Sequence, residues 1–136
     1  MPLAFAVLFQ DDHLLAVAKP RGLPTMPAGG FLTHTLLHLV RQRFREATPL
    51  HRLGRGTSGI VLFARSRPAR RVLAAAWRAG EVDKRYRALV SGVPAEETFS
   101  VDAPIGLVDH PRLGRLHAAA PGGKASLTRV RVLAAR

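Results

Sequence analysis

The chain has 136 residues, which suffices for one domain with its own hydrophobic core but not for two substantial ones. It has no cysteine, so disulfides, thiolate catalysis and cysteine-ligated metals are excluded, and no apolar run approaches the roughly 18 residues of a membrane span. The 21 lysines and arginines against 9 acids give a formal net charge of +12, which favours a polyanionic partner, most simply a nucleic acid. We expect a cytoplasmic protein without a signal peptide.

The first elements in chain order form a predicted hairpin. Two short apolar runs, residues 5–10 and 13–18, flank the turn pair Asp11-Asp12, which indicates two antiparallel strands. Residues 21–30 follow and are rich in proline and glycine. Their composition predicts a loop with a restricted backbone rather than a helix.

Two amphipathic segments predict helices. Residues 33–44 carry apolar side chains at helical spacing, and either Thr33 or Thr35 can cap the start of this helix. A second helix opens near Pro68 and stops at Gly80. Its expected buried stripe consists of Val72, Leu73, Ala76 and Trp77.

The remaining runs predict strands. Residues 59–64 are continuously apolar, which is typical of a strand buried on both faces. Residues 106–114 are rich in glycine, proline and histidine. Further strands are expected at 84–91, through Phe99 and Val101, and at 126–133. The sum is an α+β domain over residues 1–136, with a mixed or antiparallel sheet and flanking helices.

The segment whose residue types best suit a functional site lies between a predicted helix and a buried strand. It reads His51-Arg52-Leu53-Gly54-Arg55-Gly56-Thr57-Ser58-Gly59. Its glycines, hydroxyls and arginines suit an anion-binding loop, but a glycine-rich turn into a core strand fits the residue types as well. It is not a P-loop or a dinucleotide fingerprint, because a strand follows it rather than a helix, and it holds no Gly-x-Ser-x-Gly elbow.

The same run resembles the signature of the RluA-type RNA pseudouridine synthases, His-Arg-Leu-Asp-x-x-Thr-Ser-Gly followed by an apolar strand. Eight of its nine positions are compatible, and the aspartate of the family falls on Gly54. Four further segments resemble family segments in the same order. They are residues 11–23, with Lys-Pro-x-Gly, residues 84–92, with Lys-x-Tyr-x-Ala-Leu-Val-x-Gly, and residues 101–106 and 123–125.

The resemblance implies isomerisation of uridine to pseudouridine in ribosomal or transfer RNA, without a metal or an organic cofactor. Tyr86 matches the tyrosine that stacks on the target uracil, although a strand tyrosine without that role fits too. Arg52 matches the arginine that displaces or holds RNA, and Arg55 adds a cation beside it. Lys19 suits either phosphate binding or capping of a sheet end. His51 is expected near the RNA, where it fixes the loop by hydrogen bonding.

Gly54 departs from the family at the position of the catalytic aspartate. Glycine offers neither a nucleophile nor a proton acceptor, and loss of a catalytic nucleophile costs about a millionfold in turnover. The family also continues beyond the last residue with strands and a Thr-Gly-Arg-Thr-His-Gln-Ile-Arg segment, so we expect an incomplete catalytic domain that self-associates through an unpaired sheet edge. Three hypotheses stay open: a synthase impaired by Gly54, an inactive RNA-binding module, and a non-functional gene fragment.

Overall fold

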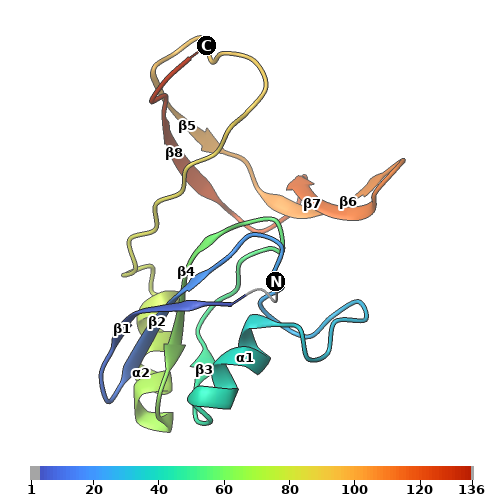
Figure 1. The fold of residues 1–136 in the computed structure, drawn as a ribbon. Coiled ribbons are helices and arrows are strands. Elements are labelled where there is room, and N and C mark those ends of the chain that lie inside the picture. Colours follow the sequence, from blue (N-terminus) through green and yellow to red (C-terminus); the bar gives the residue numbers. More distant parts are fainter. Residues whose placement is uncertain (1–3, 136) are drawn as a thin grey trace. The chain divides into compact units, whose positions relative to one another are not determined.

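The computed structural model describes residues 4–135, which form two compact units (Figure 1). The first unit ends at Arg85 and the second begins at Tyr86, and each is described by itself. Within residues 4–135, no helix has the length and apolar character that crossing a membrane requires. The single domain expected over residues 1–136 stays a prediction.

The first unit is built on a four-stranded antiparallel sheet in the order β1-β2-β4-β3. The strands β1 (Ala6–Gln10) and β2 (Leu14–Lys19) form the predicted hairpin. On the other side of β2 lies β4 (Gly59–Ala64), whose second edge pairs with the short β3 (Thr48–Pro49). Sequence patterns did not predict β3, because a two-residue strand carries no periodicity.

Both predicted helices are present and begin at hydroxyl caps. The helix α1 (Leu36–Arg43) starts after Thr35, whose Oγ1 accepts the amide hydrogen of His38 at 3.2 Å. The helix α2 (Arg67–Arg78) starts after Ser66 and has Pro68 in its first turn. Burial of Val72 was predicted wrongly, since its side chain is 67% exposed. The apolar face of α2 toward β4 is narrower than the sequence suggests.

The core of the first unit lies between the sheet and α1. Alternation along the strands places Leu15 and Val17 of β2 beside Phe63 and Val61 of β4, and all four side chains are fully buried. Burial of each such side chain contributes roughly 1.5–3 kcal/mol. Helix α1 covers this face with Leu36, Leu37 and Val40. The opposite face is more open, because Ile60 is 57% exposed, so β4 is not buried on both faces as predicted.

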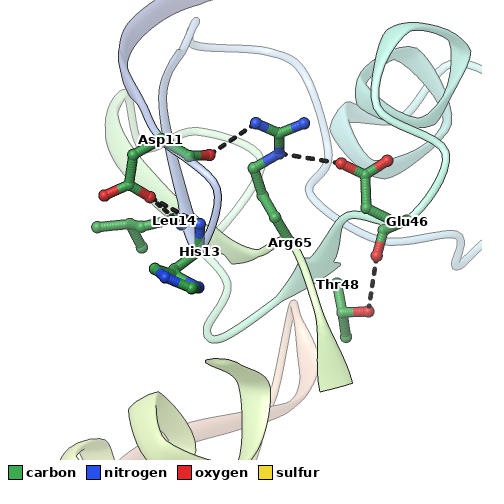
Figure 2. Close-up of polar contacts among 6 residues, drawn as sticks. All are labelled: Asp11, His13, Leu14, Glu46, Thr48 and Arg65. Atoms are coloured by element: carbon green, nitrogen blue, oxygen red, sulfur yellow. Dashed lines mark hydrogen bonds and ion pairs between the residues drawn. The ribbon is translucent and has the colours of Figure 1, made fainter. Parts of the chain in front are cut away.

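Arg65 holds three segments of the first unit together at the end of β4 (Figure 2). Its guanidinium donates to the backbone oxygen of Asp11 at 2.6 Å and to the carboxylate of Glu46 at 2.9 Å. The Asp11 carboxylate in turn accepts the amide hydrogens of Leu14 and His13 in the β1–β2 turn. These two amide donors lower the pKa of Asp11. Both carboxylates are thus occupied with local structure.

The second unit consists of two antiparallel strand pairs. β5 (Thr98–Asp102) pairs with β8 (Leu127–Arg131). Both strands were predicted, but their pairing was not. β6 (Ile105–His110) pairs with β7 (Gly114–Ala119) in a hairpin that the sequence patterns did not predict. The imidazole of His110 accepts two amide hydrogens of the turn at 3.2 Å each, which closes the hairpin. The predicted α+β class is confirmed, with antiparallel sheets and two helices among the described residues.

The strand predicted at 84–91 is absent. These residues have no regular secondary structure, and Leu89, Val90 and Tyr86 are at least 65% exposed. A strand exists only where its amide and carbonyl groups pair with a neighbour, and no described residue pairs with this segment. The alternating pattern is present without the partner that would turn it into a strand.

Candidate functional site

The segment 51–59 runs into β4 directly opposite the end of β2. In the β2–β4 register, Gly59 faces Lys19, so the loop before Gly59 lies beside the loop that follows Lys19. The backbone of Gly59 has φ +137°, a conformation that residues with a side chain rarely adopt. Within the loop, the amide of Thr57 donates to the carbonyl oxygen of Gly54 at 3.1 Å and closes a tight turn.

His51 fixes the start of the loop by standing in for a backbone group. The β3–β4 pairing continues with Leu50, whose amide donates to the carbonyl oxygen of Leu62 at 2.9 Å. The amide of Leu62 then donates to Nε2 of His51 at 3.0 Å, and the imidazole stacks on Trp77 with ring centroids 4.4 Å apart. Burial lowers the pKa of His51, and the charge of Lys84 lowers it further. The neutral ring therefore carries its hydrogen on Nδ1.

Thr25 holds the residue that precedes Gly54. Its buried hydroxyl donates to the carbonyl oxygen of Leu53 at 2.7 Å and accepts the amide hydrogen of Leu53 at 3.2 Å. Leu53 itself is buried in the core. The backbone is thus fixed by two hydrogen bonds immediately before the position where the family keeps its aspartate.

Lys19 is a buried cation bound to loop carbonyls. The alternation that buries Leu15 and Val17 also turns Lys19 inward, where it is 1% exposed. Its Nζ donates to the carbonyl oxygens of Leu23 at 2.6 Å and Pro20 at 3.0 Å, and to that of Arg55 at 3.5 Å. Burial lowers its pKa. This geometry favours the capping role over phosphate binding, and an RNA contact by Lys19 stays a prediction.

Arg55 crosses between the same two loops. Its Nε donates to the carbonyl oxygen of Gly22 at 3.2 Å, and the amide of Gly22 donates back to the carbonyl oxygen of Arg55 at 2.8 Å. The guanidinium also lies 4.9 Å from the ring centroid of Phe31, within cation–π range. The cation is therefore held in place although its side chain is exposed.

Gly54 is exposed, and its backbone does not require glycine. Its φ lies outside the left-handed region, unlike that of Gly59. A Cβ added at residue 54 would meet only Oγ1 of Thr57, at 3.8 Å, which is ordinary van der Waals contact. An aspartate could therefore occupy this position without strain, so the loop retains the geometry for a side chain that the sequence lacks.

An open pocket of about 370 Å³ surrounds Gly54. It is lined by residues from two loops, namely Pro24, Thr25, Met26, Ala28, Arg52, Leu53, Gly54 and Arg55. A hollow of about 410 Å³ lies over the β5–β8 pair, but backbone and side chains of two adjacent strands line it without a convergent polar cluster. We place the candidate site at the smaller pocket because the buried polar contacts of Thr25 and Lys19 converge on the loops around it.

The structure brings most of the predicted site residues together. Arg52, Gly54 and Arg55 line one pocket, and His51 and Lys19 anchor the loops that form it. Tyr86 is the first residue of the second unit and its side chain is 66% exposed. The loop and Tyr86 thus belong to different units, and the stacking role of Tyr86 stays a prediction.

Sequence reasoning missed the contribution of residues 21–30. Their prolines and glycines predicted a restricted loop. Nothing in that pattern indicated that the hydroxyl of Thr25 would hydrogen-bond to the backbone of Leu53, 28 residues further along the chain. The stacking of Trp77 on His51 was missed as well, since Trp77 was expected only as a core residue. The available signal was the hydroxyl of Thr25, because threonine side chains in loops commonly hydrogen-bond to backbone groups.

Comparison with known proteins supplies the family. A model of the family described as RNA pseudouridylate synthase matches residues 13–136. The chain is 38% identical to an uncharacterized RNA pseudouridine synthase of Synechocystis, over 98% of this chain and 47% of that protein. It is 37% identical to the ribosomal large subunit pseudouridine synthase C of Vibrio cholerae, over 96% of this chain and 41% of that protein. The chain thus spans less than half the length of these relatives.

Solved structures agree at the level of the fold. The human RNA pseudouridylate synthase domain containing 1 has a TM-score of 0.74 at 22% identity, over 98% of this chain and 54% of that chain. The human RNA pseudouridylate synthase domain containing 4 has a TM-score of 0.73 at 20% identity, over 96% of this chain and 54% of that chain. On the match over residues 13–136 and on the motifs quoted above, this chain belongs to the RNA pseudouridylate synthase family, in its RluA-type branch.

Proposed function

We propose that this chain binds uridine-containing RNA as a member of its family and that, with Gly54, it does not isomerise uridine by itself. The observation that carries the proposal is the composition of the pocket. Two arginines line it, and none of its lining residues is acidic. Among the acids of the first unit, Asp11 and Glu46 are held in the contacts at the far end of β4. No described residue of that pocket replaces the missing carboxylate.

The reaction explains why the carboxylate matters. The bond between N1 of uracil and C1′ of ribose breaks, the base turns, and C5 bonds to C1′. C5 then loses its hydrogen to water as a proton, and N1 gains a proton, so that the product is an isomer of uridine. A carboxylate beside the sugar serves as the nucleophile or the base for these steps. Gly54 supplies neither function, whereas the cationic lining of the pocket retains a role in holding RNA.

The charged residues support RNA as the ligand. Arg52 and Arg55 flank Gly54, and a guanidinium forms paired hydrogen bonds to phosphate oxygens. The formal net charge of +12 adds long-range attraction to a polyanion. The relative from Vibrio cholerae is named for the large ribosomal subunit, so we propose ribosomal RNA of that subunit as the first substrate to test, with transfer RNA as the comparison.

Tritium release tests the catalytic part of the proposal. RNA transcripts labelled at C5 of uridine lose tritium to water when C5 bonds to the sugar. We expect no release by the unchanged chain and none by Gly54→Asn, which fills the space without a nucleophile. Gly54→Asp restores the missing carboxylate and is the variant in which release is to be sought. Release by the unchanged chain would refute the assignment of Gly54 as the disabling residue.

Salt dependence tests the binding part. The logarithm of the RNA association constant should fall linearly with the logarithm of the salt concentration. Each arginine that contacts a phosphate displaces a counterion from the RNA, and added salt opposes this release. Arg52→Gln and Arg55→Gln should each reduce the slope by about 0.7 to 0.9, the value for one phosphate contact. Arg70→Gln on α2, an exposed arginine outside the pocket, is the matched control. Equal slopes in all variants would contradict RNA binding at this pocket.

A further inference from the structure

We propose that the pocket at Gly54 binds a small carboxylate anion, formate or acetate, in the space that an aspartate side chain at residue 54 would fill. The inference concerns the free chain and requires no RNA. It rests on three features of the described residues: open space at the α-carbon of Gly54, two arginines without an acidic partner, and a backbone held rigidly on both sides.

The space is defined by the geometry of Gly54. A Cβ at this position meets only Oγ1 of Thr57 at 3.8 Å, and the glycine lines a pocket of about 370 Å³. Formate and acetate are no larger than the side chain of aspartate. Thr57 also places a hydroxyl group, which can donate a hydrogen bond, next to this space.

The electrostatics of the pocket favour an anion. Its charged lining residues are Arg52 and Arg55, and neither forms an ion pair with an acidic side chain among residues 4–135. The ammonium of Lys19 lies 3.5 Å from the carbonyl oxygen of Arg55 and adds a buried positive charge. Two arginines thus line a space without an acidic side chain, and the buried ammonium of Lys19 lies behind the same loop.

The guanidinium of Arg55 is held in place before an anion binds. Arg55 is fixed through its Nε bond to Gly22 and its position over Phe31, which leaves its two terminal nitrogens without a partner among the described residues. Thr25 and His51 fix the backbone before Gly54. Because little side-chain entropy remains to be lost, weak hydrogen bonds suffice for measurable binding.

A carboxylate fits better than a spherical anion. The two oxygens of a carboxylate match the parallel N–H groups of a guanidinium, whereas chloride accepts without such directionality. The ligand class is therefore a planar monocarboxylate, and chloride at equal ionic strength serves as the reference. We expect half-saturation on the order of 10 mM, as two or three charge-assisted hydrogen bonds in an open site would give.

Amide NMR spectra of the 15N-labelled chain test the proposal directly. Sodium formate is added while sodium chloride is reduced, so that ionic strength stays constant. We expect saturable shifts of the amides of Gly54, Arg55 and Gly56. Arg70→Gln on α2, outside the pocket, should bind as the unchanged chain does. Arg52→Gln and Arg55→Gln should each weaken binding about tenfold.

Two variants make the inference falsifiable. Gly54→Asp supplies its own carboxylate and Gly54→Asn fills the same volume without charge, so both should abolish the saturable shifts. Linear shifts that chloride reproduces would overturn the proposal, and so would undiminished formate binding by Gly54→Asn. Because no RNA is present, these results are independent of whether the chain binds or isomerises uridine.

Discussion

Replacing His51 with phenylalanine tests whether this side chain holds the site loop to the sheet. Phenylalanine can keep the stacking on Trp77 but cannot accept a hydrogen bond from the amide nitrogen of Leu62, which lies 3.0 Å from Nε2 of His51. An amide left without a partner costs about 1–3 kcal/mol when buried, and this bond is partly buried. We therefore expect a loss of about 1–2 kcal/mol, or roughly 5–15 °C in Tm for a unit of this size.

The pH dependence of stability separates this hydrogen bond from simple packing. The pKa of His51 is lowered from 6.5 by burial and by Lys84, so the unfolded chain binds a proton at a pH where the folded chain does not. Its contribution to stability is fully present above about pH 6.5 and is lost progressively as the pH falls from 6.5 toward the folded-state pKa. His51→Phe should remove this slope.

Urea unfolding between pH 5 and 8 measures both effects. His51→Gln is the matched control, because its amide oxygen can still accept from Leu62 although it does not titrate. We expect the glutamine variant to be more stable than the phenylalanine variant and to lack the pH slope. The reasoning is refuted if His51→Phe is as stable as the unchanged chain at pH 8, or if it keeps the same slope below pH 6.5.

Three further outcomes follow from the same contacts. Gly59→Ala should lose about 1–2 kcal/mol because of its φ of +137°, whereas Gly54→Ala should stay within about 0.5 kcal/mol, and thermal unfolding distinguishes them. Thr25→Val should lower the free energy of unfolding by about 1–3 kcal/mol, measured with urea, and Thr25→Ser by much less, since serine keeps the hydroxyl. Equal losses would contradict a stabilising role for the hydrogen bonds between Thr25 and Leu53. We also propose self-association through the edge strand β1, whose Leu8 and Phe9 are at least 50% exposed. The double variant Leu8→Lys with Phe9→Lys should then have a lower apparent mass in size-exclusion chromatography. A monomeric unchanged chain would refute self-association.

The amino-acid sequence determined those parts of the fold whose signals are local. The Asp11-Asp12 turn between two apolar runs specified the first hairpin. Helical spacing specified both helices within a few residues, with a threonine cap for the first and Pro68 and Gly80 at the ends of the second. The order of the motifs was sufficient to identify the family, and the gap at Gly54 was visible without coordinates. These signals depend on neighbours a few residues apart, which a linear sequence displays.

Only the tertiary structure decided how distant residues act on one another. The hydrogen bond from Nζ of Lys19 to the carbonyl oxygen of Arg55 joins residues 36 positions apart, and those between Thr25 and Leu53 join residues 28 positions apart. These contacts depend on the β2–β4 register, which brings the loop after Lys19 beside the loop before Gly59. Conversely, the alternating pattern at 84–91 did not form a strand, because a strand needs a hydrogen-bonding partner that its own sequence does not contain. Likewise, the absence of aspartate at residue 54 was readable from the sequence, but its surroundings were not. Open space, two unpaired cations and a rigid backbone around it arise from packing between loops.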